Sequence, residues 1–217
     1  MTLLEIETPQ GRANVHLHPA DQPKAALVLC HGAGGGVTSP DLVVARDVAV
    51  SEGVSVALVE QPYRVAGRRS PPATSRLDAA WTAVLDELLA DELSGLALIA
   101  GGRSLGARVA CRTAEATGAI AVLCLAYPLQ PPARRSGGTS PSRLPELEQL
   151  TIPTLVVQGE RDRFSTPPPT RLRTVARVPG DHSLRTDPEA VAAAVRAWLP
   201  GVVDQALKSR PTAFHAT

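Results

Sequence analysis

Residues 96–111 read LALIAGGRSLGARVAC, and this stretch decides the fold of the chain. The apolar run at its start predicts a short strand, and the residues after Ser104 predict a helix. Gly102 and Gly106 lie two residues on either side of Ser104, where a side chain would collide with the neighbouring strand or helix. A serine on such a sharp turn has its hydroxyl exposed, and the helix directs its backbone N–H groups and dipole toward whatever the hydroxyl attacks. The pattern therefore predicts a nucleophilic serine at position 104.

The composition indicates one globular domain with a sizeable core. The chain has 217 residues, 44% of them hydrophobic, and no uninterrupted apolar run reaches the length of a membrane span. We expect a single domain over residues 1–200 and a weakly ordered tail over residues 201–217. The first seven residues do not resemble a secretory signal, and the three cysteines cannot all pair, so we expect a cytoplasmic protein with buried free thiols.

The net charge of +1 gives no general attraction to polyanions. The arginine pairs at positions 68–69 and 134–135 are interpreted as solvated loop charge, because no aromatic residues interleave with them for base stacking. We expect neither a nucleic-acid partner nor a membrane partner, and the sequence leaves the oligomeric state open.

Apolar strands alternate with helical patterns along most of the chain. This alternation predicts an α/β fold with a mostly parallel central sheet and helices on both faces. A loop rich in Pro, Ser, Gly and Arg spans residues 129–145, so no lid domain is expected. The expected strands are residues 3–8, 12–18, 25–30, 54–59, 96–100, 120–126, 154–158 and one within 170–177, and the expected helices are residues 40–51, 74–93, 104–116 and 188–199.

In such a sheet the reactive groups gather beyond the carboxyl ends of the strands. A serine hydrolase of this architecture carries its acid and its histidine after later strands, in the chain order Ser, Asp or Glu, His. Asp162 follows the strand at residues 154–158, and His182 follows the last strand. A serine hydroxyl is a poor nucleophile until a base accepts its proton, which assigns His182 as the base and Asp162 as the residue that orients it.

Two acids compete with Asp162 for this role. Glu160 lies in the same turn but nearer the end of the strand, and Asp181 directly precedes His182. Adjacent residues in an extended loop usually point apart, which disfavours Asp181, and we interpret both rivals as structural acids.

An acyl-transfer reaction also needs two hydrogen-bond donors for the oxyanion. The backbone N–H of Leu105, directly after Ser104, is expected to be one of them. The other is expected from the glycine loop at residues 31–36, with the Ala33 N–H as the first choice and a neighbouring glycine as the alternative. His31 is interpreted as a structural hydrogen-bonding residue of this loop.

Other interpretations of the glycine-rich segments fail on specific positions. Gly101 and Gly106 have the spacing of a P-loop, but Ala107-Arg108 stands where Lys and Ser or Thr are required. The loop at residues 31–36 begins like a dinucleotide-binding fingerprint, yet Val37 occupies the place of the third glycine. His16 and His18 share one strand face without nearby metal-binding partners. We therefore expect no cofactor and no metal.

Together these motifs resemble the α/β-hydrolase superfamily, and more narrowly its small, lidless dienelactone-hydrolase-like branch, over residues 24–200. The resemblance implies acyl transfer to water from esters or thioesters, without a cofactor. The best-known members of this branch have a cysteine nucleophile, so Ser104 makes dienelactone itself an unexpected substrate. Four segments carry the resemblance: His31-Gly32-Ala33-Gly34-Gly35, Gly102-Arg103-Ser104-Leu105-Gly106, Gly159-Glu160-Arg161-Asp162 and Gly180-Asp181-His182-Ser183.

We expect a shallow, open cleft and a small-molecule acyl substrate. Tyr63 and Tyr127 follow strand ends, Gly34 lies in the glycine loop, and Arg103 adjoins the nucleophile, so these four residues are our candidates for substrate contact. Arg103 has a second interpretation, a salt bridge that braces the serine turn. The leading hypothesis is a serine hydrolase of small esters or thioesters. The alternatives are a non-catalytic interaction module with a hydrolase fold, or a related peptidase or acyltransferase.

Overall fold

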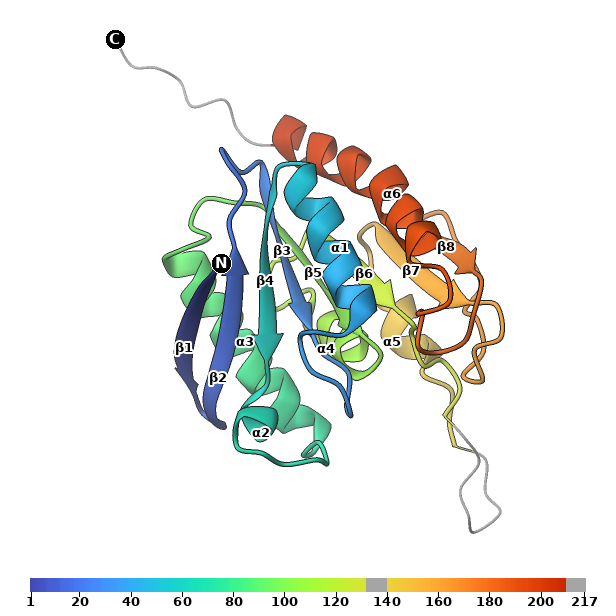
Figure 1. The fold of residues 1–217 in the computed structure, drawn as a ribbon, viewed down its shortest axis with the longest axis horizontal. Helices are drawn as coiled ribbons and strands as arrows, with labels where there is room; N and C mark the ends of the chain where they lie inside the picture. Colours follow the sequence, from blue (N-terminus) through green and yellow to red (C-terminus); the bar gives the residue numbers. More distant parts are fainter. Residues whose placement is uncertain (132–139, 210–217) are drawn as a thin grey trace.

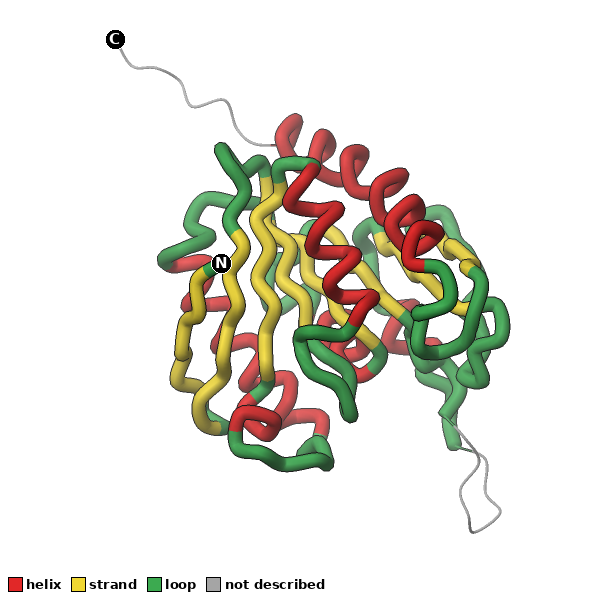
Figure 2. The backbone as a smooth tube through the Cα atoms, viewed as in Figure 1, coloured by secondary structure: helices red, strands yellow, loops and turns green. Residues whose placement is uncertain are grey.

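An eight-stranded sheet forms the centre of the computed structural model, which describes residues 1–131 and 140–209 (Figures 1 and 2). The strand order is β1-β2-β4-β3-β5-β6-β7-β8, in which β3 to β8 run parallel and the β1–β2 hairpin is antiparallel at one edge. The predicted α/β fold is therefore confirmed. The strands are β1 Thr2–Thr8, β2 Gly11–His18, β3 Ala25–Cys30, β4 Val54–Glu60, β5 Leu98–Arg103, β6 Ala121–Leu125, β7 Thr154–Gly159 and β8 Arg173–Val178.

Helices cover both faces of this sheet (Figure 1). Helices α1 and α6 pack against each other on one face, and α3 and α4 lie on the other, where α5 contacts α4. The helices are α1 Pro40–Ser51, α2 Pro62–Val65, α3 Thr74–Ala90, α4 Leu105–Thr113, α5 Leu144–Glu148 and α6 Pro188–Ser209. Among the described residues, no helix is long and apolar enough to cross a membrane.

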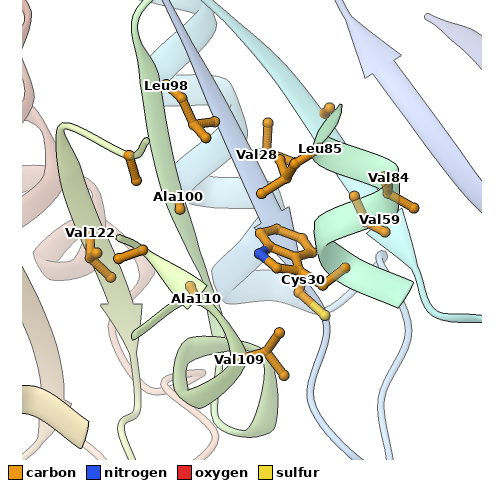
Figure 3. Packing of buried hydrophobic residues seen from close by; sticks show 14 of the residues in the cluster. Val28, Cys30, Val59, Val84, Leu85, Leu98, Ala100, Val109, Ala110 and Val122 are labelled. Atoms are coloured by element: carbon orange, nitrogen blue, oxygen red, sulfur yellow. The ribbon is translucent and has the colours of Figure 1, made fainter. Parts of the chain in front are cut away.

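The central strands are apolar throughout because both of their faces are covered. Every residue of β3 is buried, and successive side chains alternate between the two cores. Val28 lies in the core on the side of α3 and α4, together with Val84 and Val109 (Figure 3). Leu27 and Leu29 lie in the core beneath α1 and α6. This burial fixes the register of the sheet, and with it the position at which each strand ends.

Two short helices were not expected from the sequence. Helix α2 begins at Pro62, directly after β4, and α5 begins inside the stretch expected as a loop. Both have proline in their first turn, where the missing N–H costs no hydrogen bond. Residues 132–139 of the expected loop lie outside the described residues.

The prediction of a weakly ordered tail over residues 201–217 was wrong for residues 201–209. Helix α6 continues through Pro200 to Ser209, and Val202 and Val203 are buried in the core beneath α1 and α6. A proline inside a helix costs about 3 kcal/mol. Burial of two valines contributes about 1.5–3 kcal/mol each, which offsets that cost. Residues 210–217 lie outside the described residues.

Candidate active site

Ser104 occupies the turn between β5 and α4. Its backbone has φ +51° and ψ −104°, a left-handed conformation that costs a non-glycine residue about 1–3 kcal/mol. The Ser104 N–H donates to the Leu125 carbonyl at 2.8 Å, which holds the strained residue against the end of β6. The turn places the hydroxyl beyond the sheet, as expected of a nucleophile elbow.

The two glycines around Ser104 are required by close packing of the backbone. A Cβ atom at Gly102 would lie 2.5 Å from the Cys30 carbonyl oxygen and 2.7 Å from the carbonyl carbon of Gly106. A Cβ atom at Gly106 would overlap the same Cys30 oxygen and lie 2.8 Å from the His31 oxygen. The sequence prediction for both glycines is confirmed. Their packing also brings the beginning of the loop at residues 31–36 against the start of α4.

Ser104, Asp162 and His182 come together at the carboxyl ends of three different strands. His182 Nε2 lies 2.9 Å from Ser104 Oγ, and His182 Nδ1 lies 2.8 Å from Asp162 Oδ2. The Asp162 side chain is fully buried, and that of His182 is 19% exposed. With Nδ1–H donating to the carboxylate, Nε2 presents its lone pair to the serine hydroxyl. The arrangement can therefore remove a proton from Ser104.

Asp162 is held by more than the histidine. Its Oδ1 accepts a hydrogen bond from the Phe164 N–H at 2.9 Å, and its Oδ2 accepts a second one from Gln158 Nε2 at 2.6 Å. The Phe164 ring packs on the imidazole of His182, with centroids 4.4 Å apart and planes tilted by 60°. A Cβ atom at Gly159 would overlap the Asp181 carbonyl. The absence of a side chain at Gly159 therefore lets the turn that carries Asp162 meet the loop that carries His182, the histidine loop.

The two rival acids point elsewhere. Glu160 is exposed to solvent. Asp181 is also exposed, and its Oδ1 accepts hydrogen bonds from both the N–H and the hydroxyl of Ser183. These hydrogen bonds lower the pKa of Asp181. Neither carboxylate contacts the imidazole of His182.

The expected oxyanion donors are both available. Leu105 is the first residue of α4, so its N–H has no acceptor within the helix. The Ala33 N–H has no acceptor among the described residues. The Ala33 carbonyl accepts a hydrogen bond from the Tyr63 hydroxyl at 3.1 Å, which fixes one side of this peptide segment. Gly34 follows on the exposed part of the same loop.

His31 anchors this loop, as the sequence predicted. Its Nε2 accepts a hydrogen bond from the Gln61 N–H at 3.0 Å, so Nδ1 carries the proton and donates to the Gly32 carbonyl at 2.8 Å. Burial lowers the pKa of His31, which favours the neutral ring that this pair of hydrogen bonds needs. Burial likewise raises the pKa of the Cys30 thiol to about 12, so this neighbouring cysteine is a poor nucleophile.

The structure contradicts the expected substrate contact of Tyr127. Tyr127 is completely buried, and its hydroxyl lies 2.9 Å from the Arg143 carbonyl and 3.0 Å from Glu146. Burial raises the pKa of Tyr127. The residue follows a strand end, but its side chain packs into the core beside α4 instead of the cleft. Tyr63 is also buried and acts on the loop through Ala33, whereas Gly34 remains a candidate for substrate contact.

Arg103 makes two contacts with the protein. Its Nη2 donates to the His182 carbonyl at 3.0 Å, and its Nε lies 3.4 Å from the buried carboxylate of Asp41. The expected substrate contact of Arg103 stays a prediction. The alternative interpretation, a salt bridge at the serine turn, agrees with these contacts.

The contacts of Gln158 and Asp41 with the candidate site were not predicted from the sequence. Gln158 ends an otherwise apolar stretch of β7 and is completely buried, and Asp41 lies in the first turn of α1 with a buried side chain. A polar residue at a position that the pattern predicts to be buried needs a partner, and this signal was present in both places. No cluster of three or more metal-ligating side chains occurs among residues 1–131 and 140–209.

Residues 23–190 match the family model described as "Alpha/beta hydrolase domain". The chain belongs to the α/β-hydrolase family. The match includes Ser104, Asp162 and His182, together with the loop that carries Ala33. A search of curated proteins finds no sequence match to this α/β-hydrolase.

Solved structures show the same fold at low sequence identity. XC6422 from Xanthomonas campestris, described as a member of the α/β serine hydrolases without a lid, aligns over 97% of this chain and 96% of its own at 18% identity and a TM-score of 0.74. A dienelactone hydrolase from Anabaena variabilis aligns over 92% and 96% at 15% identity and a TM-score of 0.72. The esterase domain of a Rhodothermus marinus protein aligns over 94% and 98% at 15% identity and a TM-score of 0.64.

Proposed function

We propose that this α/β-hydrolase is a serine hydrolase that cleaves small carboxylic esters or thioesters through an acyl-enzyme on Ser104. The observation that carries the proposal is the chain of two hydrogen bonds, 2.9 Å from Ser104 to His182 and 2.8 Å from His182 to Asp162. A buried carboxylate behind the imidazole holds the ring in the tautomer that accepts the serine proton. The activities named for the three fold neighbours, serine hydrolase, dienelactone hydrolase and esterase, belong to the same reaction class.

The proposed reaction has two halves. In the first, His182 Nε2 takes the hydroxyl proton of Ser104 while Oγ forms a bond to the acyl carbon. The Leu105 and Ala33 N–H groups stabilise the resulting oxyanion, and each such donor contributes on the order of 3 kcal/mol. The C–O or C–S bond then breaks, and His182 returns the proton to the leaving alcohol or thiol. In the second half, water gives a proton to His182 Nε2 while its oxygen forms a bond to the acyl carbon. The bond between Ser104 Oγ and the acyl carbon then breaks, and His182 returns the proton to Oγ, which releases the carboxylic acid and restores Ser104.

Two features support small substrates and a reducing compartment. Between β6 and β7, the described residues contain only the five-residue helix α5, which leaves the carboxyl edge of the sheet without a helical lid. Cys30, Cys111 and Cys124 are free and buried, which favours the cytoplasm.

The test compares wild type with Ser104→Ala on p-nitrophenyl esters of increasing acyl length, and on amide and thioester analogues. Loss of the nucleophile in a complete triad costs up to roughly 10⁶-fold in turnover. We expect the wild type to hydrolyse short esters, Ser104→Ala to lose this activity, and a fluorophosphonate probe to label the wild type at Ser104. Equal rates for both proteins, or a folded wild type that the probe leaves unlabelled, would refute the proposal.

A further inference from the structure

The guanidinium of Arg103 lies where three segments of the active site meet. Arg103 is the residue directly before the nucleophile, at the end of β5. Its Nη2 donates to the carbonyl of His182, 79 residues away in the chain, at 3.0 Å. A Cβ atom at Gly32 would lie 2.8 Å from Arg103 Nη1. The start of the glycine loop at residues 31–36, here called the oxyanion loop, therefore packs directly on the guanidinium. One side chain therefore contacts the serine turn, the histidine loop and the oxyanion loop.

Asp41 fixes the other side of the guanidinium. Its carboxylate is completely buried, and Oδ1 accepts the Leu42 N–H at 3.0 Å. Asp41 Oδ2 lies 3.4 Å from Arg103 Nε, which makes this contact an ion pair without a hydrogen bond. A buried carboxylate needs a compensating positive charge, and among the described residues Arg103 is the cation paired with Asp41. Asp41 lies in the first turn of α1, the helix that follows the oxyanion loop. The pair thus ties Arg103 to the element that ends this loop.

The histidine loop needs such an anchor. Gly180, with φ +118°, and Leu184, with φ +52°, flank His182 in left-handed conformations. The Gly180 carbonyl accepts a hydrogen bond from the Arg161 N–H, and the Asp181 carbonyl accepts one from the Leu184 N–H. The carbonyl of His182 itself is bonded by a side chain, that of Arg103. This contact holds the backbone of His182, while Asp162 and Phe164 hold its imidazole.

We propose that Arg103, held in place by Asp41, is the positioning residue that sets His182 and the oxyanion loop relative to Ser104. The inference rests on the proposed function, since it concerns the same nucleophile and base. The proposed role requires no contact between Arg103 and the substrate, because Arg103 acts through Asp41 and the His182 carbonyl. A misplacement of reacting groups by about 1 Å can cost about 100-fold in rate.

Kinetics of four variants test the role. We expect Arg103→Gln and Asp41→Asn to lower kcat about 10- to 100-fold with KM changed less than about threefold. The double variant should be no worse than Arg103→Gln, because Asp41 acts through Arg103. Arg103→Lys should recover only part of kcat, since one ammonium group cannot reach both Asp41 and the His182 carbonyl. The double variant also removes both charges at once, so it decides the question if Arg103→Gln alone does not fold.

Arg112→Gln is the matched control. Arg112 pairs with Asp78, its side chain is 17% exposed against 18% for Arg103, and it lies on the body of α4 away from the triad. We expect this variant to be less stable in thermal unfolding with kcat per folded protein unchanged. A merely structural role for Arg103 would give the same result in Arg103→Gln, and that outcome would overturn the inference.

A second readout needs no substrate. The Nδ1–H proton of His182, hydrogen-bonded to Asp162, should give a downfield proton resonance that disappears in His182→Gln. We expect it to persist in Ser104→Ala and Arg112→Gln and to broaden or vanish in Arg103→Gln. If the wild type neither hydrolyses esters nor reacts with the fluorophosphonate, the proposed function fails while this resonance still decides the positioning role. An equally sharp resonance in Arg103→Gln, or kcat within twofold of wild type, would refute the inference alone.

Discussion

Replacement of Gln158 by leucine removes the side-chain amide that donates to Asp162, the proposed orienting acid. Gln158 is completely buried at the end of β7, and its Nε2 lies 2.6 Å from Asp162 Oδ2 and 3.2 Å from the carbonyls of Tyr127 and Ser165. Leucine fills a similar volume without a donor. It also removes Gln158 Oε1, a buried oxygen with no hydrogen-bond partner, which offsets part of the loss of stability.

The expected loss of activity follows from the charge on Asp162. A hydrogen bond to a charged group contributes about 1.5–3 kcal/mol. If that energy orients the carboxylate as the imidazolium forms, kcat in Gln158→Leu falls about 10- to 150-fold, at 1.36 kcal/mol per factor of ten. KM should stay within about twofold, because a completely buried side chain cannot touch the substrate. Steady-state hydrolysis of p-nitrophenyl acetate and the rate of fluorophosphonate labelling both measure the effect.

Gln149→Leu controls for the loss of a glutamine side-chain donor at an exposed position. Gln149 follows α5, and its side-chain amide donates to the Cys111 carbonyl at 2.9 Å, remote from the triad. This variant should keep kcat within twofold of wild type. A folded Gln158→Leu protein with unchanged or higher kcat would refute the reasoning, and would mean that His182 and the Phe164 N–H orient Asp162 without help.

Three further outcomes follow from buried groups. Burial lowers the pKa of His31, so below about pH 6.5 the unfolded chain binds a proton that the folded chain does not, and His31 should lower the stability by up to about 1.4 kcal/mol per pH unit. Burial also lowers the pKa of His18, so urea unfolding at pH 5–8 should show a smaller slope in His31→Gln than in wild type. Tyr127→Phe should lower the free energy of unfolding by about 1–2 kcal/mol and leave kcat and KM unchanged, whereas a tenfold rise in KM would restore the substrate contact that the structure contradicts. Gly106→Ala should cost at least about 3 kcal/mol in thermal or chemical unfolding because of its overlap with Cys30, while Gly201→Ala, whose Cβ would meet nothing within 4 Å, should be neutral or better.

The parts of the site that the sequence predicts are those fixed by local geometry. Gly102, Ser104 and Gly106 belong to one turn. The glycines are required because this sharp turn from strand to helix brings their backbone against the Cys30 carbonyl. The positions of Asp162 and His182 follow from strand order, because parallel strands bring their carboxyl ends to the same edge of the sheet. These inferences needed only the positions of the strands.

The direction of a side chain at a strand end could not be predicted in the same way. Tyr127 and Arg103 both lie at strand ends, where residues face a cleft in this architecture, yet the Tyr127 hydroxyl and Arg103 Nη2 both form hydrogen bonds with the protein. Tyr127 turns toward Glu146, and Arg103 turns toward Asp41, and both partners are far along the chain. A sequence pattern with a period of two predicts on which face of the sheet a side chain lies. It does not predict which distant polar group binds the polar end of that side chain.

The residues that frame the triad share a property that distinguishes them from the triad itself. Gln158 and Asp41 have buried side chains in elements whose other buried residues are mostly apolar. Each would destabilise the fold without a partner, so selection for stability alone would replace them with apolar residues. Their partners are Asp162 and Arg103, which contact His182 from opposite sides, one at Nδ1 and the other at the carbonyl oxygen. Both costs in stability converge on His182, the residue whose position the proposed reaction depends on.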